Sequence, residues 1–155
     1  MTSPLAELLG MEIKLIASFI ACLTAEQDAL KVGDVDALAV ADGRKTGLAD
    51  QLNKLEDKRN AFLKEAGFTA DRQGIADWLD RNRQDRVAGQ TWARLMKLAA
   101  EARELNNLNG QLIAVRLQAT NQALAALTRQ AQRSTLYGPN GQTTLRTGSR
   151  IIDAA

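Results

Sequence analysis

The chain has 155 residues, a length that fits one domain, and its 45% hydrophobic and 25% charged residues are ordinary for a soluble globular protein. It contains no histidine and one cysteine, which excludes histidine-based acid–base catalysis, an internal disulfide and a thiolate metal cluster. The formal net charge of +2 is unremarkable.

The charge is unevenly distributed along the chain. Residues 1–71 carry 8 Lys/Arg against 12 Asp/Glu, whereas residues 72–155 carry 12 against 6. No acidic residue lies between Glu104 and Asp153. This stretch suits either a surface for an acidic partner or a lightly basic polar face. Its arginines are too sparse, and too poor in neighbouring aromatics, to favour nucleic-acid binding.

Two features favour the cytoplasm. Cys22 lies in the apolar run at residues 19–23, which is typical of a small buried core residue in a reducing compartment. The N-terminus has no basic patch, and the uncharged stretch Leu15–Ala25 is shorter than the roughly 20 residues that span a bilayer. We therefore expect a cytoplasmic protein without a membrane span.

A first helix is predicted over about residues 4–31, ending near Val32-Gly33. Ser3 is a good N-cap and Pro4 is tolerated at the first helical position. Apolar residues follow a 4-and-3 rhythm, in which Glu12 and Glu26 fill the missing positions. The apolar stripe comprises Leu5, Leu9, Ile16, Phe19, Leu23 and Leu30.

A second helix should begin after the N-cap Asp34 and stop at Gly67. Its apolar stripe comprises Ala41, Leu48, Leu52, Leu55, Phe62 and Ala66, with Lys45 and Arg59 in the intervening positions. Gly43 and Gly47 each weaken a helix by about 1 kcal/mol relative to alanine, or else permit a close helix contact.

Between residues 68 and 83 the sequence predicts a short helix. Thr69 is the candidate N-cap, and Ile75, Trp78 and Leu79 supply its apolar face. We expect Trp78 to fold over the end of the bundle.

The third long helix is predicted from about Gln84 to about Arg133. Its apolar residues recur every seven residues, which is the spacing of left-handed helix packing. One row comprises Leu98, Leu105, Leu112, Ala119 and Ala126, and a second comprises Leu117, Leu124 and Ala131. The polar run at residues 106–110 is the point where a kink or a reversal of the helix is most compatible with the sequence.

The predicted helix lengths are unequal. At 1.5 Å per residue the first helix is about 42 Å long and the third about 75 Å, so the third should extend beyond its neighbours by roughly 30 Å. Leu117, Leu124 and Leu127 fall in the excess, and burying each is worth roughly 2 kcal/mol. A second copy, a partner helix or the chain's own tail would cover them, unless the helix folds back at Asn109-Gly110 and closes a four-helix bundle.

The predicted fold is all-α: an elongated antiparallel bundle of three long helices with coiled-coil-like packing and a short helix between the second and third. The bundle occupies residues 1–135. A flexible C-terminal tail is expected at residues 136–155, because the sequence from Leu136 to Thr144 is turn-rich and the remainder through Ala155 has too few large apolar residues to build structure alone.

Catalytic patterns are missing from the sequence. No glycine-rich phosphate loop precedes a helix, and no serine or cysteine has a histidine to activate it. We therefore predict no enzyme activity, no catalytic residue, no cofactor and no metal site.

The last predicted helix, rich in Gln, Leu and Ala, leads into Leu136-Tyr137-Gly138-Pro139-Asn140-Gly141-Gln142-Thr143. This arrangement, in a small all-helical chain without histidine, resembles the FlgN family of flagellar type III export chaperones for the hook-associated junction proteins. The likeness spans the architecture, and its specific signal is the short tail motif, where Pro139-Asn140-Gly141 departs in detail from the family pattern.

The resemblance implies a role and partners. The chaperone would bind the helical C-terminal ends of hook-associated junction proteins, prevent their premature assembly and deliver them to the export gate. Carried over, Leu117, Leu124 and Leu127 would receive the cargo, and Tyr137 would dock to the cytoplasmic domain of the gate. Tyr137 packed back on the last helix is an equally open alternative.

Two other functions remain open from the residues alone. One is a structural coiled-coil adaptor or self-assembling subunit, such as a homodimer, in which the excess of the last helix pairs with a second copy. The other is a helical bundle associated with nucleic acid.

Overall fold

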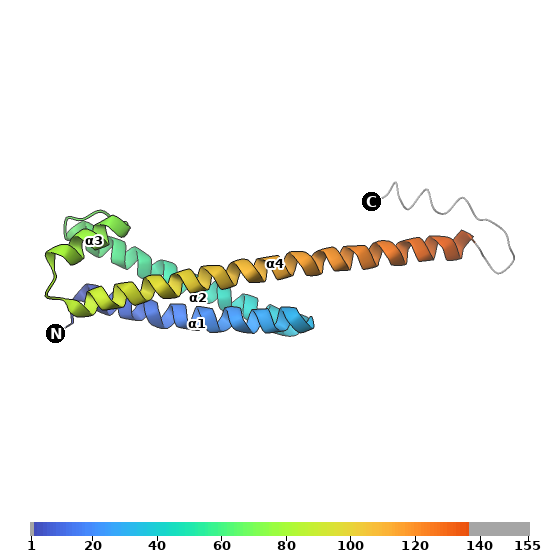
Figure 1. Ribbon diagram of the computed structural model, residues 1–155, viewed down its shortest axis with the longest axis horizontal. Coiled ribbons are helices and arrows are strands. Elements are labelled where there is room, and N and C mark those ends of the chain that lie inside the picture. Colours follow the sequence, from blue (N-terminus) through green and yellow to red (C-terminus); the bar gives the residue numbers. More distant parts are fainter. Residues whose placement is uncertain (1, 137–155) are drawn as a thin grey trace. The chain divides into compact units, whose positions relative to one another are not determined.

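The computed structural model describes residues 2–136, which form four helices (Figure 1). They are α1 (Pro4–Val32), α2 (Val35–Glu65), α3 (Arg72–Arg81) and α4 (Arg86–Leu136). The predicted all-α class, with three long helices and a short one between the second and third, is confirmed. Residues 1–112 and 113–155 separate into two compact units. The first is described here, and the described part of the second in the next subsection.

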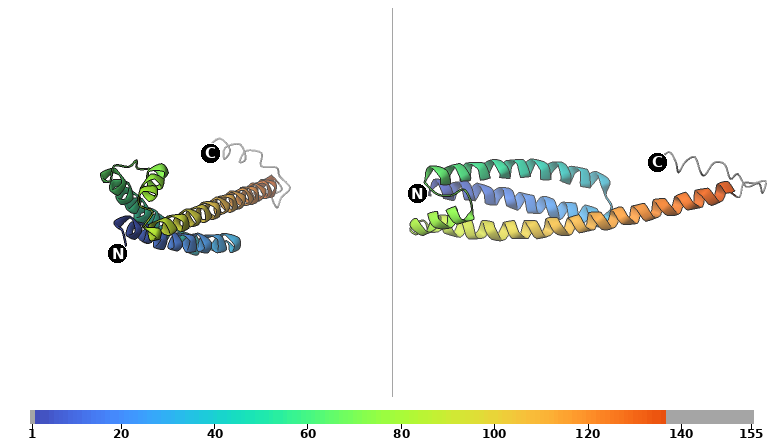
Figure 2. Two further views of the ribbon diagram at one scale, coloured as in Figure 1. Left: turned by 60° about the vertical axis from the view of Figure 1, so that its left-hand side comes forward. Right: turned by 90° about the horizontal axis from the view of Figure 1, so that it is seen from above.

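The N-terminal ends of α1 and α2 are where the sequence places them. The Ser3 hydroxyl accepts a hydrogen bond from the Ala6 N–H at 3.1 Å, and Asp34 Oδ1 accepts one from the Ala37 N–H at 3.1 Å. Each bond satisfies one of the backbone donors that a helix start leaves free. Between the helices, Gly33 adopts φ 72°, a left-handed conformation that suits glycine. The turn reverses the chain, so α1 and α2 form an antiparallel hairpin (Figure 2).

The cap of α3 differs from the prediction. Asp71, not Thr69, is the N-cap, and its Oδ1 accepts a hydrogen bond from the Gly74 N–H at 2.8 Å. Thr69 lies two residues before Asp71, and its hydroxyl donates a hydrogen bond to Asp71 Oδ1 at 2.6 Å. The Thr69 bond, followed by the backbone bond from Gly74, holds the pKa of the Asp71 carboxyl below its usual value. Thr69 therefore supports the cap instead of forming it.

All four helices contribute side chains to the core of the first unit. The buried cluster comprises Leu5, Ala6, Leu9, Leu63, Ile75, Trp78, Ala88 and Leu95. Trp78 is 7% exposed and meets Phe62 edge to face, with ring centroids 6.0 Å apart. The predicted placement of Trp78 against the end of the bundle is thus confirmed. Cys22 is also buried, as expected, and its thiol donates to the Ala41 carbonyl at 3.1 Å.

α4 is a single helix of 51 residues, against 29 in α1 and 31 in α2. It continues through Asn109-Gly110, so it neither ends nor reverses at the polar run. Within the first unit its buried positions are Ala88, Leu95, Ala102 and Asn109. The predicted row Leu98, Leu105 and Leu112 is half-buried beside them. These two rows, each with a seven-residue repeat, together make the seam of a coiled-coil-like contact.

The expectation of no membrane span considered only the uncharged stretch Leu15–Ala25, whereas the whole of α1 is long and apolar. By length and composition alone this helix of 29 residues is able to cross a membrane. A core helix of a soluble protein meets the same test. In the bundle, α1 buries Leu5, Leu9 and Leu23 together with the carboxylates of Glu12 and Glu26. Both carboxylates have cationic partners on α2, which fits a helix that packs inside a protein.

Candidate functional site

The described part of the second unit is the helical segment 113–136 of α4. Five large apolar side chains are exposed in it: Ile113 (47%), Val115 (63%), Leu117 (59%), Leu124 (56%) and Leu127 (62%). Leu117, Leu124 and Leu127 are the residues that the resemblance nominates for cargo binding. The structure leaves all three open to solvent.

Four of these residues share one side of the helix. At about 100° per residue, Ile113, Leu117, Leu124 and Leu127 fall within an arc of about 80°. We call these four residues the apolar face of α4. Ile113 was missing from the sequence prediction, although its spacing of four residues from Leu117 continues the same stripe. Val115 points to a different side and is not part of the apolar face.

The surroundings of the apolar face are polar and lack acid. The helix offers Gln118, Asn121 and Gln122 on its other sides, all exposed. Arg116 lies beside the face, and Arg129 and Arg133 lie on the opposite side of the helix, where Arg129 Nε donates to the Ala125 carbonyl at 3.4 Å. Since no acidic residue occurs after Glu104 in the described helix, the segment presents positive or neutral polar groups around an apolar stripe.

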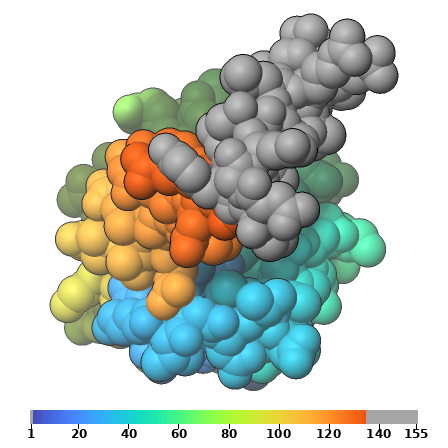
Figure 3. All heavy atoms as spheres, turned by 90° about the vertical axis from the view of Figure 1, so that its right-hand side faces the viewer, coloured from blue at the N-terminus to red at the C-terminus, as the bar shows by residue number. Residues whose placement is uncertain are grey.

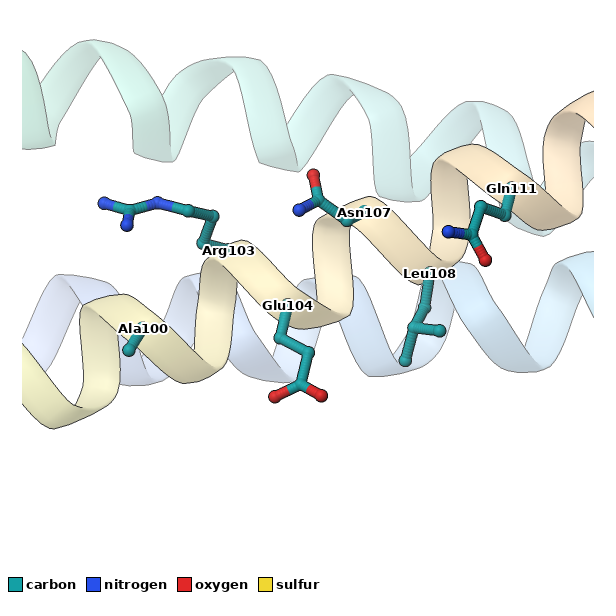
Figure 4. Close-up of a pocket in the computed structure, with 6 residues that line it drawn as sticks. All are labelled: Ala100, Arg103, Glu104, Asn107, Leu108 and Gln111. Atoms are coloured by element: carbon teal, nitrogen blue, oxygen red, sulfur yellow. The ribbon is translucent and has the colours of Figure 1, made fainter.

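A shallow groove marks the outer side of α4 in the first unit (Figure 4). Its volume is about 390 Å³, and every residue that lines it is exposed. The lining residues are Ala100, Arg103, Glu104, Asn107, Leu108 and Gln111. Figure 4 shows them along one helix, with the ribbons of α1 and α2 behind. A groove on one helix cannot enclose a small molecule, so it is not a ligand pocket of the usual kind.

No group of three or more possible metal ligands occurs among the described residues 2–136.

Buried charged residues take part in two polar layers across the bundle, which we call the Arg59 layer and the Asn109 layer. In the Arg59 layer, the guanidinium of Arg59 pairs with Glu12 and lies over the ring of Trp92, 5.6 Å from its centroid. In the Asn109 layer, Glu26 contacts Lys45 and accepts a hydrogen bond from Asn109.

The sequence marked these positions without pairing them. Glu12 and Glu26 interrupt the stripe of α1, and Lys45 and Arg59 that of α2, at spacings that match in an antiparallel hairpin. The signal that would have found the pairs is charge complementarity between the two interrupted stripes. Desolvation is the main influence on Glu12 and raises the pKa of its carboxyl, although the nearby Arg59 opposes this.

Tyr137, the predicted docking residue, lies outside the described residues 2–136, as do Arg146 and Arg150. The predicted tail at residues 136–155 also lies outside the described residues, apart from Leu136, which is the last residue of α4.

Comparison with known proteins decides the family. The model of the family described as "FlgN protein" matches residues 1–144. This chain belongs to the FlgN family. Two curated relatives, each named "Flagella synthesis protein FlgN", come from Salmonella typhimurium strain LT2 and Salmonella typhi. Each is 25% identical over 149 residues, covering 95% of this chain and 96% of the relative. No solved structure gave a significant match.

Membership in the FlgN family has a functional meaning at a coarse level. It assigns the chain to flagellum biogenesis in a chaperone role. The FlgN family is a chaperone-type family and not a known enzyme family. Its partners are accordingly expected among flagellar proteins.

Proposed function

We propose that this protein is a cytoplasmic chaperone that binds the helical C-terminal ends of hook-associated junction proteins and delivers them to the flagellar type III export apparatus. The observation that carries the proposal is the apolar face of α4, whose three leucines are 56–62% exposed. Binding would prevent premature assembly of the cargo by covering the helical surface that the cargo uses in the filament.

The apolar face suits an amphipathic helix as its partner. A stripe at positions i, i+4, i+11 and i+14 presents side chains along about 20 Å of one helix side, which matches the stripe of another helix. Covering a leucine side chain is worth up to roughly 2 kcal/mol, and the four residues together supply enough for specific but reversible binding. Because Arg116 lies beside the face and the segment has no acidic residue, a cargo helix with acidic residues beside its apolar stripe fits best.

Delivery is proposed to depend on Tyr137, outside the described residues. It is the only tyrosine of the chain and follows directly on α4. An aromatic side chain next to the cargo segment is a suitable anchor for the cytoplasmic domain of the export gate. Cargo and gate would then be held by neighbouring but distinct parts of one chain.

The proposal is tested by measuring stoichiometry. Light scattering of the protein alone, and then with a peptide from the C-terminal end of a hook-associated protein, should give a defined complex with that peptide. A peptide of the same composition in scrambled order is the control, since it keeps charge and apolar content but loses the stripe. A dimer that buries residues 117–127 and ignores the cargo peptide would instead support a structural coiled-coil subunit.

A further inference from the structure

Asn109 is fully buried in the contact between α4 and α1. It is 0% exposed, and its Nδ2 donates two hydrogen bonds, to the Leu23 carbonyl at 2.8 Å and to Glu26 Oε1 at 2.9 Å. Since both partners are acceptors, only the amide nitrogen can face them, which fixes the orientation of the side chain. Lys45 Nζ lies 3.6 Å from the same Glu26 oxygen, so the layer joins α1, α2 and α4.

The half-buried row of the α4 seam carries little information about its axial position, because Leu98, Leu105 and Leu112 are identical residues at intervals of seven. The buried row alternates between alanine and leucine, at Ala88, Leu95 and Ala102, so a slide by one heptad would exchange the two residue types there and this row also favours the observed alignment. If α4 slid by one heptad, leucine would replace leucine along the half-buried row. Ala102 would take the place of Asn109, and Glu26 would lose the amide donor and keep only Lys45. Loss of a hydrogen bond to a buried charged group is unfavourable.

We propose that Asn109 sets the axial register of α4 on the α1–α2 hairpin. A single buried asparagine at such a seam position is a known means of specifying register in coiled coils, because only one alignment satisfies its amide. Its Oδ1 has no hydrogen-bond partner, so only the nitrogen of its amide is satisfied in this alignment. The register determines which residues of α4 are buried and which remain exposed. If the proposed function holds, Asn109 therefore also determines where the cargo-binding segment begins.

The Arg59 layer also favours the observed alignment of α4. Arg59 meets Trp92 of α4 while it pairs with Glu12 of α1, so a slide of α4 would also remove Trp92 from the guanidinium. Trp92 is half-buried and its contact is less demanding than the two hydrogen bonds of Asn109. Asn109 is accordingly the position at which removal should reveal a second alignment.

The connection between α3 and α4 does not by itself prevent the slide. It consists of the turn that follows Asn82, closed by a bond from the Asp85 N–H to the Asn82 carbonyl at 2.9 Å. Unwinding one turn of α4 releases about 2 Å of chain per residue, since extended backbone rises about 3.4 Å per residue and a helix 1.5 Å. Opening the turn and the first helical turn together allows a slide toward the α1–α2 turn, which lies at one end of the bundle (Figure 3).

The test is a pair of spin labels within the first unit of the full chain. Cys22→Ser removes the native thiol and retains a donor to the Ala41 carbonyl. Glu7→Cys on α1 and Gln111→Cys on α4, both exposed, then carry the labels. In this background, the label-to-label distance distribution should show one component. With Asn109→Leu, a second component about 10 Å longer should appear, since one heptad rises about 10 Å along a helix.

The controls separate alignment from stability. Asn107→Leu makes the same chemical change on the exposed side of the same helix and should keep the single distance. Asn109→Ala removes the amide without added bulk and should also give two components, which covers the case in which the leucine variant does not fold. A single unchanged distance in every folded Asn109 variant, with only lower stability, overturns the proposal. Because no cargo is used, that result leaves the proposed function untouched, and failure of the unmodified protein to bind the cargo peptide would leave the distance result standing.

Discussion

Glu12 of α1 and Arg59 of α2 form an ion pair inside the bundle, with side chains only 6% and 13% exposed. Glu12 Oε1 and Arg59 Nε nevertheless lack hydrogen-bond partners. A buried pair with unsatisfied atoms is weak evidence for stability, because desolvation of the two charges offsets their attraction. The raised pKa of the Glu12 carboxyl, caused mainly by burial, indicates that desolvation is the larger effect at this site.

The first prediction concerns the pH dependence that Glu12 introduces. Since its pKa is higher in the folded than in the unfolded chain, the folded state binds more protons, and the contribution of Glu12 to stability falls as pH rises from about 4.5 through the folded pKa. Urea unfolding of Glu12→Gln and of the unmodified protein should therefore diverge with pH, in favour of the variant. Exposed Glu65→Gln is the control and should show no such divergence. A gain of the unmodified protein over Glu12→Gln with rising pH would mean that the attraction to Arg59 dominates.

The second prediction compares two leucines of the same helix. Leu95 is 4% exposed in the core and Leu117 is 59% exposed. Leu95→Ala should lower the free energy of unfolding by about 3 kcal/mol, because it leaves a cavity. Leu117→Ala should change it by about 0.5 kcal/mol or less. Denaturant unfolding of both variants gives the answer, and equal losses would show that Leu117 is covered in the free protein.

The third prediction uses two glycines in helices. A Cβ on Gly74 would lie 1.7 Å from the Thr69 carbonyl oxygen, whereas one on Gly47 meets nothing within 4 Å. Gly74→Ala should destabilise the protein by about 1–3 kcal/mol, because the added methyl group is overpacked against the backbone. Gly47→Ala should stabilise it by up to about 1 kcal/mol, because alanine is the better helix former. Thermal unfolding measures both, and a loss at Gly47 would indicate a close helix contact there after all.

The fourth prediction addresses cargo binding. Leu124→Asp together with Leu127→Asp should weaken binding of the hook-associated peptide at least about 100-fold, since it removes two apolar contacts and introduces two charges. Unfolding should remain cooperative, because both side chains are more than half exposed. The matched control is Val32→Asp with Val35→Asp, two exposed valines beside the α1–α2 turn, which should leave binding unchanged. Unfolding of the leucine double variant would mean that these residues belong to a core.

The fifth prediction separates delivery from binding. Tyr137→Ala should leave the affinity for the cargo peptide unchanged and reduce export of hook-associated proteins in cells that carry the variant. Tyr137→Phe is the control, since it keeps the aromatic ring and loses only the hydroxyl. Loss of cargo affinity in Tyr137→Ala would assign the residue to the cargo surface instead of the gate.

Much of the local structure was readable from the sequence. The caps Ser3 and Asp34, the left-handed Gly33 and the 4-and-3 apolar rhythm predicted α1 and α2 within a residue or two. Such features act over a few neighbouring residues, so they need no knowledge of the fold. The cap of α3 was misplaced because Thr69 and Asp71 are both good caps, and only the course of the backbone decides which one receives the Gly74 N–H.

The candidate site was partly readable in the same way. The great length of α4 and the positions of Leu117, Leu124 and Leu127 followed from periodicity and the lack of proline, and Ile113 was overlooked within the same pattern.

The sequence by itself determined that the chain is helical, where its helices begin and which of them is longest, because propensity, capping and periodicity are properties of neighbouring residues. Only the tertiary structure decided that α4 continues through Asn109-Gly110, that Ala102 and Asn109 belong to its buried row, and that Glu12 meets Arg59 while Glu26 meets Asn109. These outcomes depend on which helix faces which, and at what height. The free energy of a buried polar group is set by partners that lie as many as 86 residues away along the chain.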